Sequence, residues 1–289
     1  MMQDAVGQFA RAALRDRIRE FEAARALSDQ VRRRAHEMAL GGVALPAACG
    51  GQELGMVTRV LLEEEIARVD PAAAFALPGP GAFGDAILEL CADPAMQAEL
   101  LAPFFEPGAH NRHGAVAWSE AKPCRERPGL STVATEVGGE WRISGKKAYV
   151  HNAGLADRFV VFAQVEPERG WQGLGAFVVM GDAPGLTIGE RHETLGLDAA
   201  WFGALALEDV PARRVTPAGD FTTALLRFFA RHALVVGARA VGLSQSAFDL
   251  AREYCDTRVA FGKPIGHFQA VAFTLADRLM DVESARWML

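Results

Sequence analysis

The sequence predicts an α+β fold in three parts: an N-terminal helical bundle at residues 1–112, a middle antiparallel β-sandwich or barrel at 113–217, and an incomplete C-terminal helical domain at 218–289. Apolar residues recur three and four positions apart at first, follow strand-like spacing from about His113, and return to helical spacing from about Asp220. No helical stretch separates the predicted strands, which argues against a βαβ architecture. The 289 residues, 50% of them hydrophobic, are enough to bury a sizeable core.

The first part is expected to contain several helices, with the clearest helical spacing from Val57 to Val69. Two stretches interrupt the pattern. LPAACGG (Leu45 to Gly51) is rich in turn-forming residues. PAAAFALPGPG (Pro71 to Gly81) has three prolines and two glycines, so we expect no helix to continue through it.

The middle part contains short runs rich in β-branched and aromatic residues, each bounded by glycine or proline. The runs are AVAWS, STVATEV, EWRIS, RFVVFAQV, GAFVVM and GALALEDV. Gly138 and Gly139 separate the second run from the third, and a two-residue glycine turn is a strong hairpin signal. Strands at this spacing predict a sandwich or barrel of about one hundred residues.

The last part predicts two helices, at 221–254 and from His267 to the end, joined by the turn GKPIG. In the second helix the apolar residues recur mainly three and four positions apart, and they are Phe268, Val271, Leu275, Leu279, Val282 and Met288. No glycine or proline stops this pattern before Leu289, so the C-terminal part is expected to be shortened. Nothing later in the chain would cover this apolar face, so we expect association with a copy or a related chain.

Composition excludes several classes of protein. The 30 Lys and Arg residues against 36 Asp and Glu give a net charge of -6, so we expect no nucleic-acid partner. The basic run Arg32 to Arg34 is expected on a solvated helix face. No run of about 20 apolar residues predicts membrane insertion, and Asp4 and several arginines stand where a secretory signal needs an apolar core. We therefore expect a cytoplasmic protein.

The cysteines indicate no metal site and no disulfide framework, because none is paired at a characteristic spacing. They are Cys49, Cys91, Cys124 and Cys255, and we expect all four to be reduced. A nucleophilic role for Cys49 is disfavoured because no histidine lies near it in the sequence.

Four stretches, in order along nearly the whole chain, together resemble the acyl-CoA dehydrogenase family. The most specific is RVAFGKPIGHFQAV followed by LADRLMDVESAR, similar to a signature helix-turn-helix of the C-terminal domain. GGVALPAACGGQELG resembles the N-terminal turn of the family, and AVAWSE the strand under the flavin ring. ISGKKAYVHNAGLADRFVVFAQV resembles the strand, turn and strand at the other edge of the ring. The resemblance implies a C-terminally shortened member or a subunit.

This resemblance implies FAD as cofactor, between the strand domain and the C-terminal helices. By position, Val116, Trp118 and Ser119 are expected to offer backbone and hydroxyl groups to the pyrimidine side of the flavin. Tyr149 and His151 are expected at the dimethylbenzene edge and N5, where the family usually has Trp and Thr. An imidazole can donate to N5 as a hydroxyl does, although it is larger and its protonation depends on its surroundings.

The adenine end of the cofactor is implied to reach a neighbouring subunit. Arg258, Phe261 and Gln269 are expected at the pyrophosphate and adenine of a cofactor held mostly by another subunit. A guanidinium suits a diphosphate through parallel hydrogen bonds. The alternative for Arg258 is a surface cation at a helix end, and Phe261 could equally be a core residue.

The turn after Glu120 departs from the family. It reads AKPCRERPG, where the family has proline, glycines and a Ser-Asp pair that let backbone amides approach phosphates. Pro123 has no amide hydrogen to donate. Lys122 and Arg125 add charge that can still meet a phosphate of FAD or CoA.

The catalytic residue is left unassigned. The reaction of the family needs a carboxylate opposite the flavin, and most members carry it beyond the point where this chain stops. Some members carry it on the helix matching 221–254, but no Asp or Glu lies between Asp220 and Asp249, and Arg239 occupies one candidate place. His232 is the alternative base, although a lone helical histidine more often faces a core or an interface.

The function implied is α,β-dehydrogenation of an acyl-CoA thioester, with FAD as hydride acceptor and an electron-transfer partner for the reduced flavin. One alternative is a non-catalytic partner subunit of a heteromeric acyl-CoA dehydrogenase. Another is a flavin-dependent oxygenase on the same fold, which needs no α-carbon base. The acyl group is not identified, although PAAAFALPGPG falls where the family borders its acyl pocket.

Overall fold

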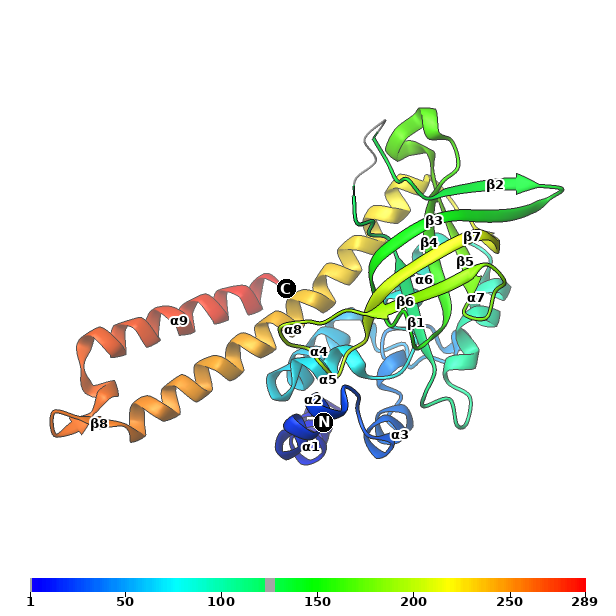
Figure 1. Ribbon diagram of the computed structural model, residues 1–289. Helices are drawn as coiled ribbons and strands as arrows, with labels where there is room; N and C mark the ends of the chain where they lie inside the picture. Colours follow the sequence, from blue (N-terminus) through cyan, green and yellow to red (C-terminus); the bar gives the residue numbers. More distant parts are fainter. Residues whose placement is uncertain (1, 123–127) are drawn as a thin grey trace.

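The computed structural model describes residues 2–122 and 128–289. Helices, then strands, then helices follow one another along the chain (Figure 1), so the predicted three-part order is confirmed. Pro123 and Arg125 of the altered turn, and Cys124, lie outside the described residues.

The N-terminal part is a bundle of seven α-helices in the described chain. They are α1 (Met2–Ala13), α2 (Ile18–Ala24), α3 (Asp29–Glu37), α4 (Gly55–Val69), α5 (Pro71–Ala76), α6 (Gly81–Leu90) and α7 (Pro94–Leu101). Ser28, Asp70 and Asp93 cap three of them by accepting backbone N–H groups of the first turn. One apolar core lies among α1 to α5, and a second joins α6 and α7 to the sheet and to the start of α8.

As expected, no helix continues through the proline-rich stretch, but its first residues form the short helix α5, which was not predicted. Pro71 occupies the first helical turn, where a backbone N–H would have no intrahelical partner. The Asp70 carboxylate accepts the Ala72 N–H at 2.9 Å and fixes the start of the helix. Leu77 is already extended, so the helix ends before Pro78. The chain therefore leaves the helical conformation at Leu77, after the short helix α5.

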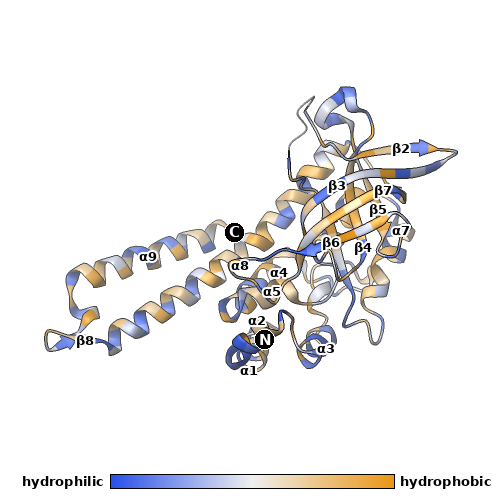
Figure 2. Ribbon diagram, viewed as in Figure 1, coloured by the Kyte–Doolittle hydropathy of each residue, from blue (hydrophilic) through white to orange (hydrophobic). Residues whose placement is uncertain are grey.

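The middle part is a seven-stranded sheet. Its strands are β1 (His113–Ala117), β2 (Val133–Val137), β3 (Glu140–His151), β4 (Ala156–Gln164), β5 (Leu174–Met180), β6 (Leu186–Arg191) and β7 (Phe202–Val215). The order is β1-β4-β2-β3-β7-β5, and β5 also pairs with β4, so the sheet closes on itself as a barrel. Figure 2 shows its apolar strands in orange, around the third core.

The predicted hairpin is confirmed, because Gly138 and Gly139 take φ values of +62° and +86° between β2 and β3. Two features were not expected. Strand β6 was missed, and β1 pairs with β4 in parallel rather than antiparallel. The parallel pairing is possible because the long β2–β3 segment joins the two strands, and a parallel pair needs a long crossover.

The C-terminal part consists of the long helix α8 (Phe221–Thr257), the short hairpin of β8 (Val259–Ala260) and β9 (Lys263–Pro264), and α9 (Gln269–Met288). The Asp220 carboxylate accepts the Thr223 N–H at 2.8 Å and starts α8. Helices α8 and α9 form an arm that extends from the body of the molecule (Figure 1). Where α8 crosses α4, a Cβ on Gly242 would lie only 2.4 Å from the Glu64 carbonyl oxygen, so the two backbones are in close contact.

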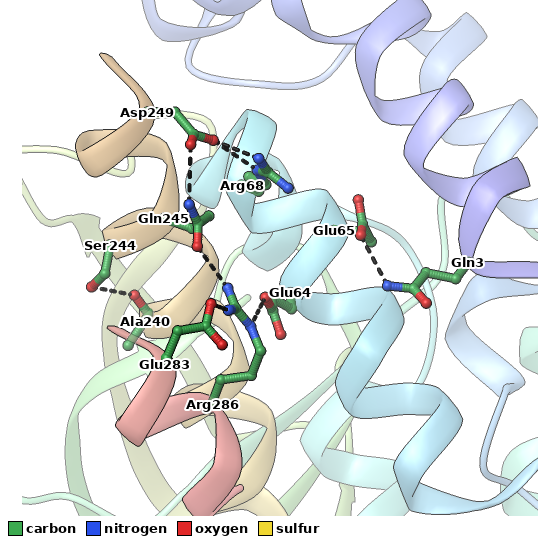
Figure 3. A network of polar contacts seen from close by, with 10 residues as sticks. All are labelled: Gln3, Glu64, Glu65, Arg68, Ala240, Ser244, Gln245, Asp249, Glu283 and Arg286. Carbon is green, nitrogen blue, oxygen red and sulfur yellow. Dashed lines mark hydrogen bonds and ion pairs between the residues drawn. The ribbon is translucent and has the colours of Figure 1, made fainter. Parts of the chain in front are cut away.

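The end of α9 is bound to the body by a polar network (Figure 3). Arg286 donates to Glu64 of α4 and to Gln245 of α8, each at 2.8 Å. Gln245 in turn donates to Asp249 at 3.0 Å, and Arg68 of α4 donates to the same carboxylate. The network joins α4, α8 and α9, so the arm is fixed at the base while its far end projects.

Both helices of the arm carry apolar side chains that are exposed at intervals of seven residues. On α8 they are Val236, Leu243 and Leu250, and on α9 they are Phe273, Met280 and Trp287. Val282 is the only fully buried residue of α9. Of the predicted apolar face, Phe268, Val271 and Leu275 are half-buried and Leu279 and Met288 are exposed, so the exposed stripe of α9 consists of residues outside that face.

Three further expectations concern single features. None of the described helices is long and apolar enough to cross a membrane. The basic run on α3 is ion-paired within the helix, with Arg33 on Asp29 and Arg34 on Glu37. Cys49 is buried, and burial raises the pKa of its thiol, which disfavours a nucleophilic role.

Candidate functional site

A cavity of about 350 Å³ lies where the three parts of the chain meet. Its lining comes from α4, α5 and α6, from the ends of β1 and β3, and from the first half of α8. This volume is within the range of small-molecule sites. The cavity also lies between the strands and α8, the place at which the resemblance puts the flavin.

All five residues expected at the flavin ring line this cavity: Val116, Trp118, Ser119, Tyr149 and His151. Trp118 and Ser119 follow the end of β1. The ring centroids of Phe162 and Phe229 each lie 5.0 Å from the ring centroid of Trp118. The structure thus brings together residues from two stretches about thirty positions apart. The pairing of Ala148 N–H with the Ser119 carbonyl at 2.8 Å holds the two stretches in register.

Tyr149 has an unusual backbone. It has φ +55° at an irregularity in the pairing of β3 with β7, and 69% of the residue is exposed. This left-handed conformation is costly for a residue with a Cβ atom. Tyr149 and His151 line the same cavity, and the tyrosine ring lies 5.5 Å from the His192 ring.

His151 is held as a neutral imidazole. Burial, followed by the nearby Arg239 charge, lowers the pKa of His151 to about 3. Its Nε2 atom is buried and finds no hydrogen-bond partner among the described residues, and the ring of Phe75 stands edge-on at 5.6 Å. A buried nitrogen without a partner costs about 1–3 kcal/mol, which a ligand atom at that position would recover.

His232 lies on the α8 side of the same cavity. Burial lowers the pKa of His232 below its usual value, so this imidazole is also neutral near pH 7. Its Nδ1 atom has no partner among the described residues, and its ring stacks on Phe228 at 6.1 Å. The position is compatible with a base, although the lowered pKa makes it a weak one.

Beneath the Trp118 edge lies a buried ion pair. Lys147, 1% exposed, donates to the Trp118 carbonyl at 3.0 Å and to Glu120 at 3.1 Å. Glu120 also accepts the backbone N–H groups of Ser131 at 2.7 Å and of Thr132 at 2.8 Å. These contacts therefore connect Glu120, just before the altered turn, to Ser131 and Thr132 after it and to Lys147 of β3.

Sequence reasoning missed the charged wall of the cavity. Arg59 and Glu63 of α4 and Arg239 of α8 line it. Glu63 accepts the Arg239 Nε–H at 2.8 Å, and Arg59 donates to the fully buried Asp85 at 2.6 Å. The spacing of Arg59 and Glu63, four residues apart on one helix face, was the available signal, but such pairs usually face solvent.

The remaining predicted residues lie elsewhere, on the arm. Arg258 is the C-cap of α8, Phe261 is 96% exposed in the turn between β8 and β9, and Gln269 begins α9. None of the three lines the cavity. They lie together at the far end of the arm (Figure 1), so they can serve only a cofactor that reaches this end from outside the chain.

The residues at the cavity fit a flat heteroaromatic ring such as that of FAD. The Trp118 and Phe229 rings offer apolar contacts, and the unpartnered His151 nitrogen offers a hydrogen bond at a ring edge. No group of His, Cys, Asp and Glu side chains in the described residues could hold a metal ion.

Comparison with known proteins gives the family. Models of the N-terminal, middle and C-terminal domains of acyl-CoA dehydrogenases match residues 1–106, 115–210 and 221–289. Cyclohex-1-ene-1-carbonyl-CoA dehydrogenase of Geobacter metallireducens is 33% identical over 84% of this chain, and the chain spans 64% of that relative's length.

Two solved structures share the fold. The Tcur3481-Tcur3483 steroid ACAD has 31% identity and a TM-score of 0.80, over 98% of this chain and 73% of that one. PigA, solved with FAD and proline, has 22% identity and a TM-score of 0.88, over 99% and 76%. The chain belongs to the acyl-CoA dehydrogenase family.

Proposed function

We propose that the chain binds FAD and takes part in the α,β-dehydrogenation of an acyl-CoA thioester, as a subunit of a homo- or hetero-oligomer. The observation that carries the proposal is the convergence of Val116, Trp118, Ser119, Tyr149 and His151 on one cavity between the β-domain and α8. When bound, FAD supplies a hydride acceptor for the β-carbon of the thioester.

The residues of the chain would orient the ring and keep water away from it. Trp118 and Phe229 would cover the ring with apolar surface, and the carbonyl and hydroxyl of Ser119 would lie at the pyrimidine edge. His151 would place its buried Nε2 at N5, and because the Phe75 carbonyl takes the one N–H of the neutral imidazole at Nδ1, Nε2 would accept a hydrogen bond there. Arg258 and Gln269 would serve the diphosphate and adenine of a cofactor bound mainly by another subunit.

The proton at the α-carbon has no free carboxylate to accept it in the described lining. Glu63 is the one carboxylate among the lining residues, and it is ion-paired with Arg239 at 2.8 Å and Arg59 at 3.8 Å. Arg239 stays protonated and cannot act as a base. His232 remains a weak alternative. This favours a second candidate, in which the chain is the partner subunit of a catalytic, related chain.

The exposed apolar stripes of α8 and α9 support such an assembly. Residues at intervals of seven on two neighbouring helices form a surface suited to helix packing. The Tcur3481-Tcur3483 steroid ACAD, whose name joins two gene products, is one of the related structures. An electron-transfer partner for the reduced flavin and an acyl-CoA substrate complete the proposal.

Reconstitution tests the proposal. The purified chain is mixed with FAD, alone and with a homologous chain expressed beside it, and bound flavin is measured from the absorbance retained after gel filtration. We expect stoichiometric flavin in the oligomer and a perturbed flavin spectrum on addition of an acyl-CoA. A chain that assembles but retains no flavin under either condition would refute the cofactor assignment.

A further inference from the structure

Seven charged side chains form one alternating series from the surface to the cavity. Neighbours in the series are 2.6 to 3.8 Å apart, and the order is Arg227, Glu89, Arg231, Asp85, Arg59, Glu63 and Arg239. The outer end, Arg227, has 61% of its side chain exposed, whereas the inner end, Arg239, has 13%. The series starts and ends with arginine.

The series therefore carries four guanidinium groups against three carboxylates, a surplus of one positive charge in the described residues. No other described acidic side chain forms an ion pair with any of its members. Arg227 is close to water, which screens its charge. Arg239 is mostly buried, so water screens its charge less, and buried charges are normally paired. The surplus is thus least compensated at Arg239.

The guanidinium of Arg239 is positioned to bind a ligand in the cavity. It donates through Nε to Glu63, and it lies over the Phe75 ring with 4.4 Å to the centroid. Within residues 2–122 and 128–289, nothing accepts a hydrogen bond from its two Nη groups, and neither nitrogen is among the buried unpartnered atoms. Arg239 lines the cavity, so these N–H groups are open to it.

Arg239 also lies close to the reactive edge of the site. Phe75 contacts both the Arg239 guanidinium and the His151 ring. The positive charge of Arg239 also helps to lower the pKa of His151. A ligand in the cavity that contacts Phe75 and His151 would therefore lie close to the Arg239 guanidinium. A planar fork of two N–H groups fits a carboxylate with two parallel hydrogen bonds.

We propose that Arg239 selects acyl-CoA substrates whose acyl group carries a carboxylate, which would become the fourth anion of the charged series. The inference rests on the proposed function, because it names the substrate class of the same site. A plain alkyl chain at this position would leave the fork and the surplus charge without a partner. The inner wall of the cavity thus distinguishes dicarboxylic from monocarboxylic acyl groups.

Binding calorimetry on the FAD-loaded protein tests this with three pairs of thioesters matched in carbon number: succinyl-CoA and butanoyl-CoA, glutaryl-CoA and pentanoyl-CoA, and adipyl-CoA and hexanoyl-CoA. Charge-assisted hydrogen bonds predict that the carboxylated member of at least one pair binds about 10- to 100-fold more tightly. Arg239→Met should remove this preference while weakening the alkyl ester by no more than about 3-fold.

Arg68→Met is the matched control, because Arg68 bridges the same two helices through Asp249 but does not line the cavity. It should keep the preference. Equal or weaker binding of every carboxylated ester in the unaltered protein would overturn the inference while leaving the proposed function standing, and this comparison needs no variant to fold. If no ester of either kind binds although FAD does, the proposed function fails, and the inference with it.

Discussion

Replacing Lys147 with methionine tests the role of the buried ion pair at the base of the site. Methionine keeps most of the side-chain volume but removes the ammonium group, so the Trp118 carbonyl and Glu120 each lose a donor. Glu120 keeps the N–H groups of Ser131 and Thr132 and the Thr132 hydroxyl. Three donors thus remain for a carboxylate whose side chain is only 8% exposed.

The expected loss of stability is about 3 kcal/mol. Removal of one partner from a buried pair typically costs about 3–5 kcal/mol, and the three remaining donors place this site at the lower end. For a chain of this size that corresponds to a melting temperature lower by roughly 5 °C. The double variant Glu120→Gln with Lys147→Met should lose less than the single variant, because no uncompensated charge is left buried.

The pH dependence gives a second measurement. Burial lowers the pKa of Lys147 to about 8, below that of the unfolded chain at 10.5. Between these values the unfolded chain holds the extra proton, so stability from this group rises with pH in that window. The rise should be absent in the methionine variant.

The assay is urea unfolding of each variant from pH 7 to pH 10. Lys146→Met is the control, because Lys146 is the exposed neighbour on the same strand. It should change stability by less than about 0.5 kcal/mol. A double variant less stable than the single one would refute the reasoning, since it would mean that the Glu120 carboxylate stabilises the fold even without Lys147.

Three further variants test other parts of the account. Arg258→Ala should weaken FAD binding to the oligomer by about 10-fold or more in fluorescence titrations, because charge-assisted hydrogen bonds to the diphosphate are lost. Gly242→Ala should destabilise the chain by about 1–3 kcal/mol in urea, because its Cβ would lie 2.4 Å from the Glu64 carbonyl oxygen and 2.9 Å from the Arg68 nitrogen. His151 has a pKa of about 3 in the folded chain and 6.5 in the unfolded chain, so stability should fall as pH drops below 6.5, by about 2 kcal/mol at pH 5. His151→Gln should remove this slope in FAD-free protein.

Each variant has a control. Arg252→Ala changes an exposed arginine of the same helix and should leave FAD affinity unchanged. Gly237→Ala meets only the flexible Leu289 side chain and should alter stability by less than about 1 kcal/mol. His267→Gln removes an exposed histidine and should keep the acid slope. If a control shows the same change in FAD affinity, stability or acid slope as the variant it is paired with, the explanation given for that variant is wrong.

Much of the fold could be read from the sequence because it depends on local patterns. The two changes of hydrophobic period gave the order of the parts, and Gly138 and Gly139 gave a hairpin. Strand β6 escaped notice because LTIGER has no clear alternation and becomes a strand through its pairing with β7. Helix α5 escaped because its prolines were read as breakers, whereas Pro71 opens the helix.

The site was predictable only in part. The strand residues that line the cavity lie in stretches with recognisable motifs, so their convergence was expected. The charged wall was not, because Glu63 meets Arg239, and Asp85 meets Arg59, only through the packing of α4, α6 and α8. A spacing of four residues on a helix does not show whether the pair faces water or a cavity. In this chain the packing of α4 against α8 places the pair of Arg59 and Glu63 at the cavity.

Anaerobic mixing of the FAD-loaded chain with acyl-CoA thioesters tests the central claim most directly. The panel includes short, medium-length, steroid-like and carboxylated acyl groups, and flavin absorbance reports the reaction. We predict that the chain alone bleaches its flavin slowly or not at all, because a positioned base contributes roughly 10²- to 10⁴-fold and Glu63, the one carboxylate in the described part of the lining, is ion-paired. Rapid bleaching by any thioester without a partner chain would contradict the account and show that a competent base lies in this chain.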